Sequence, residues 1–200
     1  MGRILLSTFA LAIGLALPAQ AASLSKTYSY FNIGGRTLVE IEKELGRRGP
    51  KLNGTGKRHP GATRMEFNTR LGYGERRGRC AVVEARVAVK ATVILPRWRQ
   101  RGADGDVRFV WETLASDIKR HEEAHVVIAK NHARELEDAL KAVRPGRTCE
   151  ETAARAKQVN DRILAKHDAA QDDFDRVENI NFESRILRLM EHRLKRAAGG

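Results

Sequence analysis

The chain has 200 residues, 42% of them hydrophobic, and its formal net charge is +12. About 180 residues beyond an N-terminal leader suit one domain with a core of its own. The basic excess would suit nucleic acid, but the leader predicts export and thereby excludes that partner; an anionic cell-envelope polymer fits the charge instead.

Residues 1–21 have the features of a signal peptide. Arg3 precedes an apolar run over residues 4–17, and Pro18 ends this run before Ala19-Gln20-Ala21. Signal peptidase requires this small-x-small pattern, and the run is shorter than the roughly 20 residues of a membrane span. We therefore predict a protein exported to the periplasm or the medium, with a single domain over residues 22–200.

The first half of that domain is predicted to form strands and one helix. KTYSYFNI (26–33) has strand composition, and a capping box at Thr37–Glu40 starts a helix that ends at GRRGP. After a loop over 49–62, alternating apolar residues predict a strand over 62–73. GERRGR (74–79) is then a turn, and a long strand runs from Cys80 until Pro96 ends it. The expected core face of that strand comprises Val83, Ala85, Val87, Val89, Ala91, Val93 and Leu95.

The second half is predicted to be helical. One helix covers residues 107–143, Pro145-Gly146 breaks it, and a capping box at Thr148–Glu151 opens a second helix to about residue 178. A short break between long helices predicts an antiparallel hairpin. A basic amphipathic helix over 182–198 closes the chain and either docks on the domain or contacts a membrane surface. The fold class is therefore α+β: a small antiparallel sheet packed with a long antiparallel helical hairpin.

Two cysteines, Cys80 and Cys149, are present. In an oxidising compartment an isolated pair most simply forms one disulfide, which here would join the start of a strand to the turn of the hairpin. We therefore predict a Cys80–Cys149 bond.

The motif HEEAH at residues 121–125 indicates a metal site on the first long helix. His121 and His125 are one helical turn apart, so both imidazoles can reach one zinc ion. Glu122 lies on the same side and is placed to act as the base that takes a proton from an activated water. The alternative is that both histidines are core residues of a seam that also contains Leu114, Ile118, Ile128, His132, Leu136 and Leu140.

A zinc site needs a third protein ligand, and the opposing helix is its expected source. His132 is about 10 Å beyond His125 along the helix, too far to share the ion. If the hairpin pairs Val143 with Cys149, His121 faces Gln171 and His125 faces His167, each to within a turn. The acceptable ligands in that window are His167, Asp168, Asp172, Asp173 and Asp175.

The chain resembles the bacterial predicted secreted zinc-dependent proteases over about residues 26–178. The resemblance rests on YSYFNIGGRTLVEIEKELGRRGP, TVILPRW, RHEEAHVVIAKNHARELE, the second cysteine and AQDDFD. It implies that His121 and His125 bind the metal, that Glu122 is the catalytic base, and that Asp175 is the third ligand. Members continue with a histidine-glycine pair soon after this aspartate, whereas this chain reads ENINFES.

These features predict a secreted or periplasmic metallopeptidase that uses Zn²⁺ to hydrolyse a peptide or protein substrate. Tyr73, Arg97 and His167 are the residues that could polarise the substrate carbonyl. The alternative function is a non-catalytic cell-envelope binding protein, with a structural or vestigial metal site and a basic surface that holds an anionic polymer.

Overall fold

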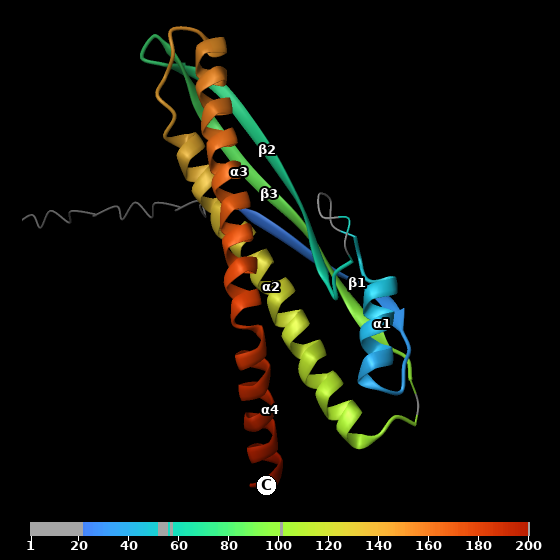
Figure 1. Ribbon diagram of the computed structural model, residues 1–200. Coiled ribbons are helices and arrows are strands. Elements are labelled where there is room, and N and C mark those ends of the chain that lie inside the picture. Colours follow the sequence, from blue (N-terminus) through green and yellow to red (C-terminus); the bar gives the residue numbers. More distant parts are fainter. Residues whose placement is uncertain (1–21, 52–55, 57, 101, 200) are drawn as a thin grey trace, which may run out of the picture.

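Alternating apolar and polar residues form three strands in a single sheet, shown with the helices in Figure 1. The computed structural model describes residues 22–51, 56, 58–100 and 102–199, so the predicted signal peptide lies outside the described residues. The strands are β1 (Ser23–Ile33), β2 (Ala62–Arg76) and β3 (Arg79–Trp98), in the order β1-β3-β2. β2 and β3 form an antiparallel hairpin whose turn consists of Arg77 and Gly78, both with positive φ, which is shorter than the six-residue turn that the sequence predicts.

The expectation of a purely antiparallel sheet is wrong for β1. This strand pairs parallel with β3, from Ser23 opposite Ala88 to Ile33 opposite Trp98. Helix α1 (Leu38–Arg48) and β2 lie between the two strands in the sequence. β2 occupies one edge of β3, so β1 pairs along the opposite edge. The connection through α1 and β2 is long enough to return the chain, so β3 runs parallel to β1.

One face of the sheet packs against the helices, and the other carries polar side chains. Val87, Val89 and Val93 of β3 are at most 1% exposed on the packed face. Val83, which we expected there, is 50% exposed because it is the extra residue of a β-bulge: Gly72 pairs with Glu84, and Tyr73 pairs with Val82.

Pro96 does not end β3 as the sequence predicts, and backbone direction explains why. The N–H of Arg99 donates to the carbonyl of Ile33, so odd-numbered residues in this part of β3 face β1 and even-numbered residues face β2. Because β2 begins at Ala62, opposite Ile94, no β2 residue pairs with Pro96. The missing N–H of Pro96 therefore removes no bond from the β2–β3 ladder.

Two long helices cover the packed face. α2 (Gly105–Lys141) and α3 (Cys149–Ile180) form the predicted antiparallel hairpin, and Thr148 caps α3 by accepting a hydrogen bond from Glu151. Leu136 and Leu140 of α2 are fully buried in one cluster with Ala156 and Ile163 of α3 and with Val87 and Val89 of β3. The core is therefore shared by the sheet and the hairpin, which gives the α+β fold that the sequence predicts.

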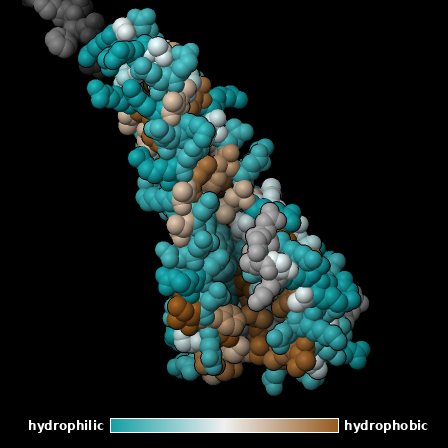
Figure 2. Space-filling model, turned by 45° about the horizontal axis from the view of Figure 1, so that its top comes forward, coloured by the Kyte–Doolittle hydropathy of each residue, from teal (hydrophilic) through white to brown (hydrophobic). Residues whose placement is uncertain are grey.

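α4 (Phe182–Ala198) continues from α3 after Asn181 and docks along the first half of α2. Arg185 contacts the buried Asp117 at 3.1 Å, and Arg193 contacts Glu112 at 2.8 Å. α4 has no buried residue, and Leu187 and Leu194 are more than half exposed. Figure 2 shows a largely hydrophilic surface whose hydrophobic residues gather toward the lower end. Docking is thus observed, whereas membrane contact through the exposed face stays a prediction.

No helix among the described residues combines the length and the apolar composition needed to cross a bilayer.

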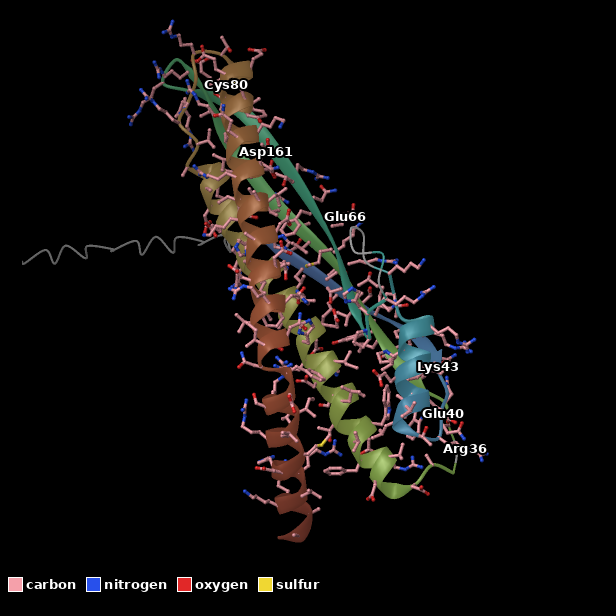
Figure 3. The ribbon with its side chains drawn as sticks, in the orientation of Figure 1. Arg36, Glu40, Lys43, Glu66, Cys80 and Asp161 are labelled. Carbon is pink, nitrogen blue, oxygen red and sulfur yellow. A yellow bond between two sulfur atoms is a disulfide. The ribbon has the colours of Figure 1, made fainter. Side chains whose placement is uncertain are left out.

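The predicted disulfide is confirmed. Cys80 and Cys149 are bonded, and Cys80 lies at the end of the sheet next to the start of α3 (Figure 3). The backbone of Cys80 also exchanges two hydrogen bonds with Gly146 in the turn between α2 and α3. The covalent bond therefore joins the sheet to the turn of the hairpin.

Reduction of this disulfide is expected to destabilise the protein by about 4 kcal/mol, because the bond closes a long loop in the unfolded chain. The cysteines are 69 residues apart in sequence. Urea unfolding of the oxidised and the reduced protein measures the difference. A Cys80→Ala/Cys149→Ala variant is the control and should not respond to the reductant. Identical unfolding curves for oxidised and reduced protein would contradict a stabilising role.

Candidate metal centre

The two histidines of the HEEAH motif meet on one side of α2. One helical turn separates them, and their Nε2 atoms are 3.1 Å apart. His125 is buried, and His121 is about one quarter exposed at its side chain. Two Nε2 atoms directed at one point form half of a tetrahedral zinc site.

Asp175 of α3 brings a carboxylate oxygen to the same point. Its Oδ1 lies 3.1 Å from Nε2 of His121 and 3.0 Å from Nε2 of His125. These are ion-pair distances without hydrogen-bond geometry, and the buried Oδ1 atom has no hydrogen-bond partner within the described residues. A buried oxygen without such a partner indicates a missing cation, because an unsatisfied charged group is costly to bury.

The three donor atoms fit a zinc ion. In a tetrahedral site with ligands at 2.0–2.1 Å, neighbouring ligand atoms are about 3.3 Å apart. The three separations here are 3.0–3.1 Å, so only small side-chain movements are needed. Two imidazoles and one carboxylate form the donor set of catalytic zinc sites, which leave a fourth position open. His121, His125 and Asp175 can therefore hold a metal ion.

The register of the hairpin brings Asp175, rather than the other candidate ligands, to the histidines. His125 contacts Gln171 and Asp175, one and two turns beyond the His167 that we expected opposite it. Residues 142–148 connect α2 to α3, and Gly146 within this turn bonds to the backbone of Cys80. The residues of α3 that face the histidines therefore lie farther along the helix than a tight turn would place them. Asp172 is exposed on α3.

Glu122 lies beside the three donor atoms, outside the group that could bind the ion. It is 5% exposed, and its Oε2 accepts a hydrogen bond of 2.8 Å from the hydroxyl of Thr63 at the start of β2. The same hydroxyl lies 2.9 Å from the backbone carbonyl of Glu122. Burial raises the pKa of Glu122, although Thr63 and the two histidines oppose this effect. Thr63 therefore fixes the orientation of a carboxylate with increased proton affinity.

Gly61 allows the chain to pass very close to Glu122. A Cβ atom at this position would lie 2.8 Å from Oε1 of Glu122 and 2.9 Å from a methyl carbon of Ile118. Any other residue at this position would therefore displace the side chain of Glu122 or the segment that contains residue 61. Neither Gly61 nor Thr63 can be recognised from the sequence as part of the site, because both lie far from HEEAH in the chain and only tertiary packing brings them to it.

A chain of hydrogen bonds sets the tautomer of His125. Its Nδ1 lies 2.6 Å from Oε1 of Gln171, and a carbonyl oxygen only accepts, so Nδ1 carries the proton and Nε2 offers its lone pair. The Gln171 amide nitrogen donates to Nε2 of His167 at 2.8 Å, and Nδ1 of His167 bonds to Asp168 at 2.9 Å. His167 therefore contacts the centre through Gln171 and is not among the residues whose donor atoms meet at one point. Gln171 was not singled out from the sequence.

His121, the other histidine of the motif, has an acidic partner in the ENINFES segment. This is the segment that stands where the resemblance leads one to expect a histidine-glycine pair. Nδ1 of His121 lies 3.4 Å from Oε2 of Glu178, the first residue of ENINFES. Glu178 also pairs with Arg120 and Arg185. Phe174 stacks on the His121 ring with centroids 5.0 Å apart. Each imidazole is thus oriented from its outer side, as is usual for metal-binding histidines.

The electrostatics of the centre favour a cation. Burial opposes ionisation of Asp175, but His121 and His125 hold the pKa of its carboxyl well below the ordinary value. Burial also lowers the pKa of His125, yet its contacts with Asp175 and Gln171 raise that pKa above the ordinary value overall. The carboxylate therefore stays charged, and positive charge at the imidazole is stabilised.

A cleft of about 220 Å³ opens onto the centre. One wall is the segment 59–63, the floor is α2 with His121 and Glu122, and the far wall includes Phe182 and Arg185 of α4. The residues Tyr73 and Arg97, considered from sequence as carbonyl-polarising groups, do not line this cleft, and the Arg97 guanidinium lies over the Tyr30 ring. His132 bonds to the carbonyl of Ile128 and is not among the group that could bind the ion.

Replacing Gln171 with methionine is expected to weaken zinc binding about 10–100-fold, because Nδ1 of His125 loses the acceptor that fixes its tautomer. Competition with a chromophoric chelator measures the affinity. Gln158→Met, at an exposed position of the same helix, is the matched control and should bind as the wild type does. Equal affinities for the two variants would show that Gln171 does not orient the ligand.

No curated protein and no solved structure matches the chain. The family model described as a bacterial protein of unknown function (DUF922) matches residues 28–183, which include most of the sheet, the disulfide and all three donor residues. The chain therefore belongs to the DUF922 family of bacterial proteins.

Proposed function

We propose that the protein is an exported zinc-dependent metallopeptidase that hydrolyses a peptide or protein substrate. The observation that carries this proposal is the meeting of three metal-binding atoms, from His121, His125 and Asp175, beside the buried carboxylate of Glu122. A purely structural metal site usually has four protein ligands. Three donors, a neighbouring base and an open cleft instead suit catalysis.

Zinc is the ion that the donor set favours, since imidazole nitrogens together with one carboxylate suit it better than Ca²⁺ or Mg²⁺. When bound, it supplies a Lewis acid that polarises a carbonyl and lowers the pKa of a water to about 7. Gln171 and Glu178 hold the outer nitrogens of the two imidazoles, so the inner lone pairs stay directed at one point.

Glu122 is the proposed general base. Its Oε2 is held by Thr63, and Oε1 faces Gly61 in the wall of the cleft. The carboxylate takes a proton from the attacking water as the new C–O bond forms on the peptide carbonyl carbon. It then returns the proton to the amide nitrogen as the C–N bond breaks, releasing a carboxylic acid and an amine. Burial assists this role because it raises the proton affinity of the group.

Export is supported by the Cys80–Cys149 bond, since disulfides persist mainly in oxidising compartments. The net charge of +12 suits attraction to an anionic cell-envelope polymer, which would hold the enzyme near its substrates. This partner remains a prediction.

The central test separates metal binding from chemistry. Zinc content measured by mass spectrometry is expected to be one per wild-type molecule and to fall to near zero in His121→Ala, His125→Ala and Asp175→Ala. Glu122→Gln should retain zinc but lower the hydrolysis of a quenched fluorescent decapeptide library by about 10²–10⁴-fold, because only the base is lost. Chelation should abolish the wild-type activity, and added zinc should restore it.

The outcomes distinguish the alternatives. Zinc that binds normally to all three ligand variants would disprove the metal centre. A wild type that binds zinc but cleaves no library peptide would contradict the peptidase and leave a structural metal in a binding protein, with chelation lowering only the melting temperature.

Gly61→Ala tests the close approach of the strand to Glu122. The added methyl group would collide with Oε1 of Glu122, so we expect hydrolysis to fall at least about tenfold while zinc affinity stays unchanged. Gly34→Ala is the matched control, because a Cβ atom there meets nothing within 4 Å. Wild-type activity in Gly61→Ala would show that the position of Glu122 is not critical.

A further inference from the structure

The β1–β3 ladder ends where β1 begins, although β2 and β3 stay paired beyond that point, and the side chain of a helix residue closes the ladder. Ser23, the first residue of β1, pairs with Ala88, so no β1 residue pairs with Val87. The N–H of Val87 instead donates to Oε2 of Glu137 on α2, at 3.0 Å. Glu137 is 3% exposed. A buried carboxylate therefore stands at the open end of the β1–β3 ladder.

The carboxylate occupies the place of a strand carbonyl. Odd-numbered residues of this part of β3 face β1, so the N–H of Val87 points to the line along which β1 would extend. In a regular parallel ladder this N–H would bond to the carbonyl of the residue before Ala22. Glu137 thus provides the acceptor that a strand carbonyl would otherwise offer to the Val87 N–H.

The predicted cleavage site falls at the same bond. Signal peptidase acting after Ala19-Gln20-Ala21 produces a mature chain that begins at Ala22. Ala22 packs against the hydrophobic core formed by the sheet and the α2–α3 hairpin. Cleavage there would create an α-ammonium group at Ala22, one residue before the Ser23–Ala88 pair that starts the β1–β3 ladder.

The surroundings of Glu137 can accept that charge. Its other oxygen, Oε1, lies 2.6 Å from the ammonium of Lys141, a half-exposed side chain. Oε2 has only the Val87 N–H as a partner within the described residues. A cavity of about 450 Å³ borders Ser23, Val87, Ala88 and Glu137, which leaves room for an ammonium group and its water.

We propose that Glu137 is the internal binding site for the α-ammonium group of Ala22, which cleavage of the signal peptide creates. Processing then completes an ion pair at the end of the sheet and stabilises the folded enzyme after export. The proposal rests on the export that is part of the proposed function, but it does not depend on the metal centre or on peptidase activity.

Removal of the N-terminal charge tests the proposal. The exported protein is purified, and mass spectrometry of its N-terminal peptide identifies the first residue, expected to be Ala22. Pyridoxal-phosphate transamination under mild denaturation converts the α-amine to a ketone without lengthening the chain. After refolding, the melting temperature is expected to be roughly 2–8 °C lower than that of protein treated identically without pyridoxal phosphate.

The matched control is Glu137→Gln, whose amide oxygen still accepts from the Val87 N–H but carries no charge. Transamination should leave the melting temperature of this variant unchanged to within about 1 °C. Equal decreases in the wild type and in Glu137→Gln, or no decrease in either, would overturn the binding site. An N-terminal residue other than Ala22 would overturn the predicted cleavage instead. A chain made to begin at Ala22 by cleavage of a fusion protein then tests Glu137 on its own.

Discussion

The packing of α2 against α3 positions every group of the metal centre. α2 supplies His121, Glu122 and His125, whereas Asp175 and Gln171 come from α3. A shift of one helical turn between the helices would move Asp175 about 5 Å along the axis and separate it from both imidazoles. The register is held at the far end of the hairpin by the Cys80–Cys149 bond and the Cys80–Gly146 backbone pair, and along its length by Leu136, Leu140, Ala156 and Ile163. The core and the disulfide therefore determine the geometry of a site that they do not touch.

The contacts on the outer nitrogens of the two imidazoles favour cation binding as much as the three donor atoms do. The Gln171 amide nitrogen donates to His167 and to the backbone carbonyl of His125, which keeps its oxygen directed at Nδ1 of His125. His167 is in turn oriented by Asp168 at the surface. His167 is buried near the centre like a candidate ligand, but it supports His125 through Gln171. Among the described residues, Oδ1 of Asp175 is the one buried side-chain oxygen or nitrogen without a hydrogen-bond partner, and it lies between the two imidazole Nε2 atoms.

The sheet contacts α2 at two places. At one end of the sheet, the segment 59–63 brings Gly61 and Thr63 against Glu122, so this carboxylate is held by a strand as well as by its own helix. Near the middle of β3, Glu137 of α2 closes the β1–β3 ladder where β1 starts. Both contacts tie α2 to the sheet, and α2 is the element that carries the two histidines. The long helix α2 therefore packs on the sheet at two separate contacts along its length.

Much of this protein could be predicted from local sequence. The spacing of HEEAH places two imidazoles and a carboxylate on one side of a helix, because helical geometry is local and nearly invariant. Capping residues likewise located the starts of α1 and α3, and the paired cysteines indicated the disulfide. Only the tertiary structure decided that Asp175 rather than His167 meets the histidines, since helix register depends on the width of the turn and its bonds to Cys80. Contacts between residues distant in the chain also determine the parallel direction of β1 and the presence of Pro96 inside β3. The same holds for the contacts that Gln171, Thr63 and Gly61 make with the site. A local sequence pattern cannot show which distant residues will be neighbours in the fold.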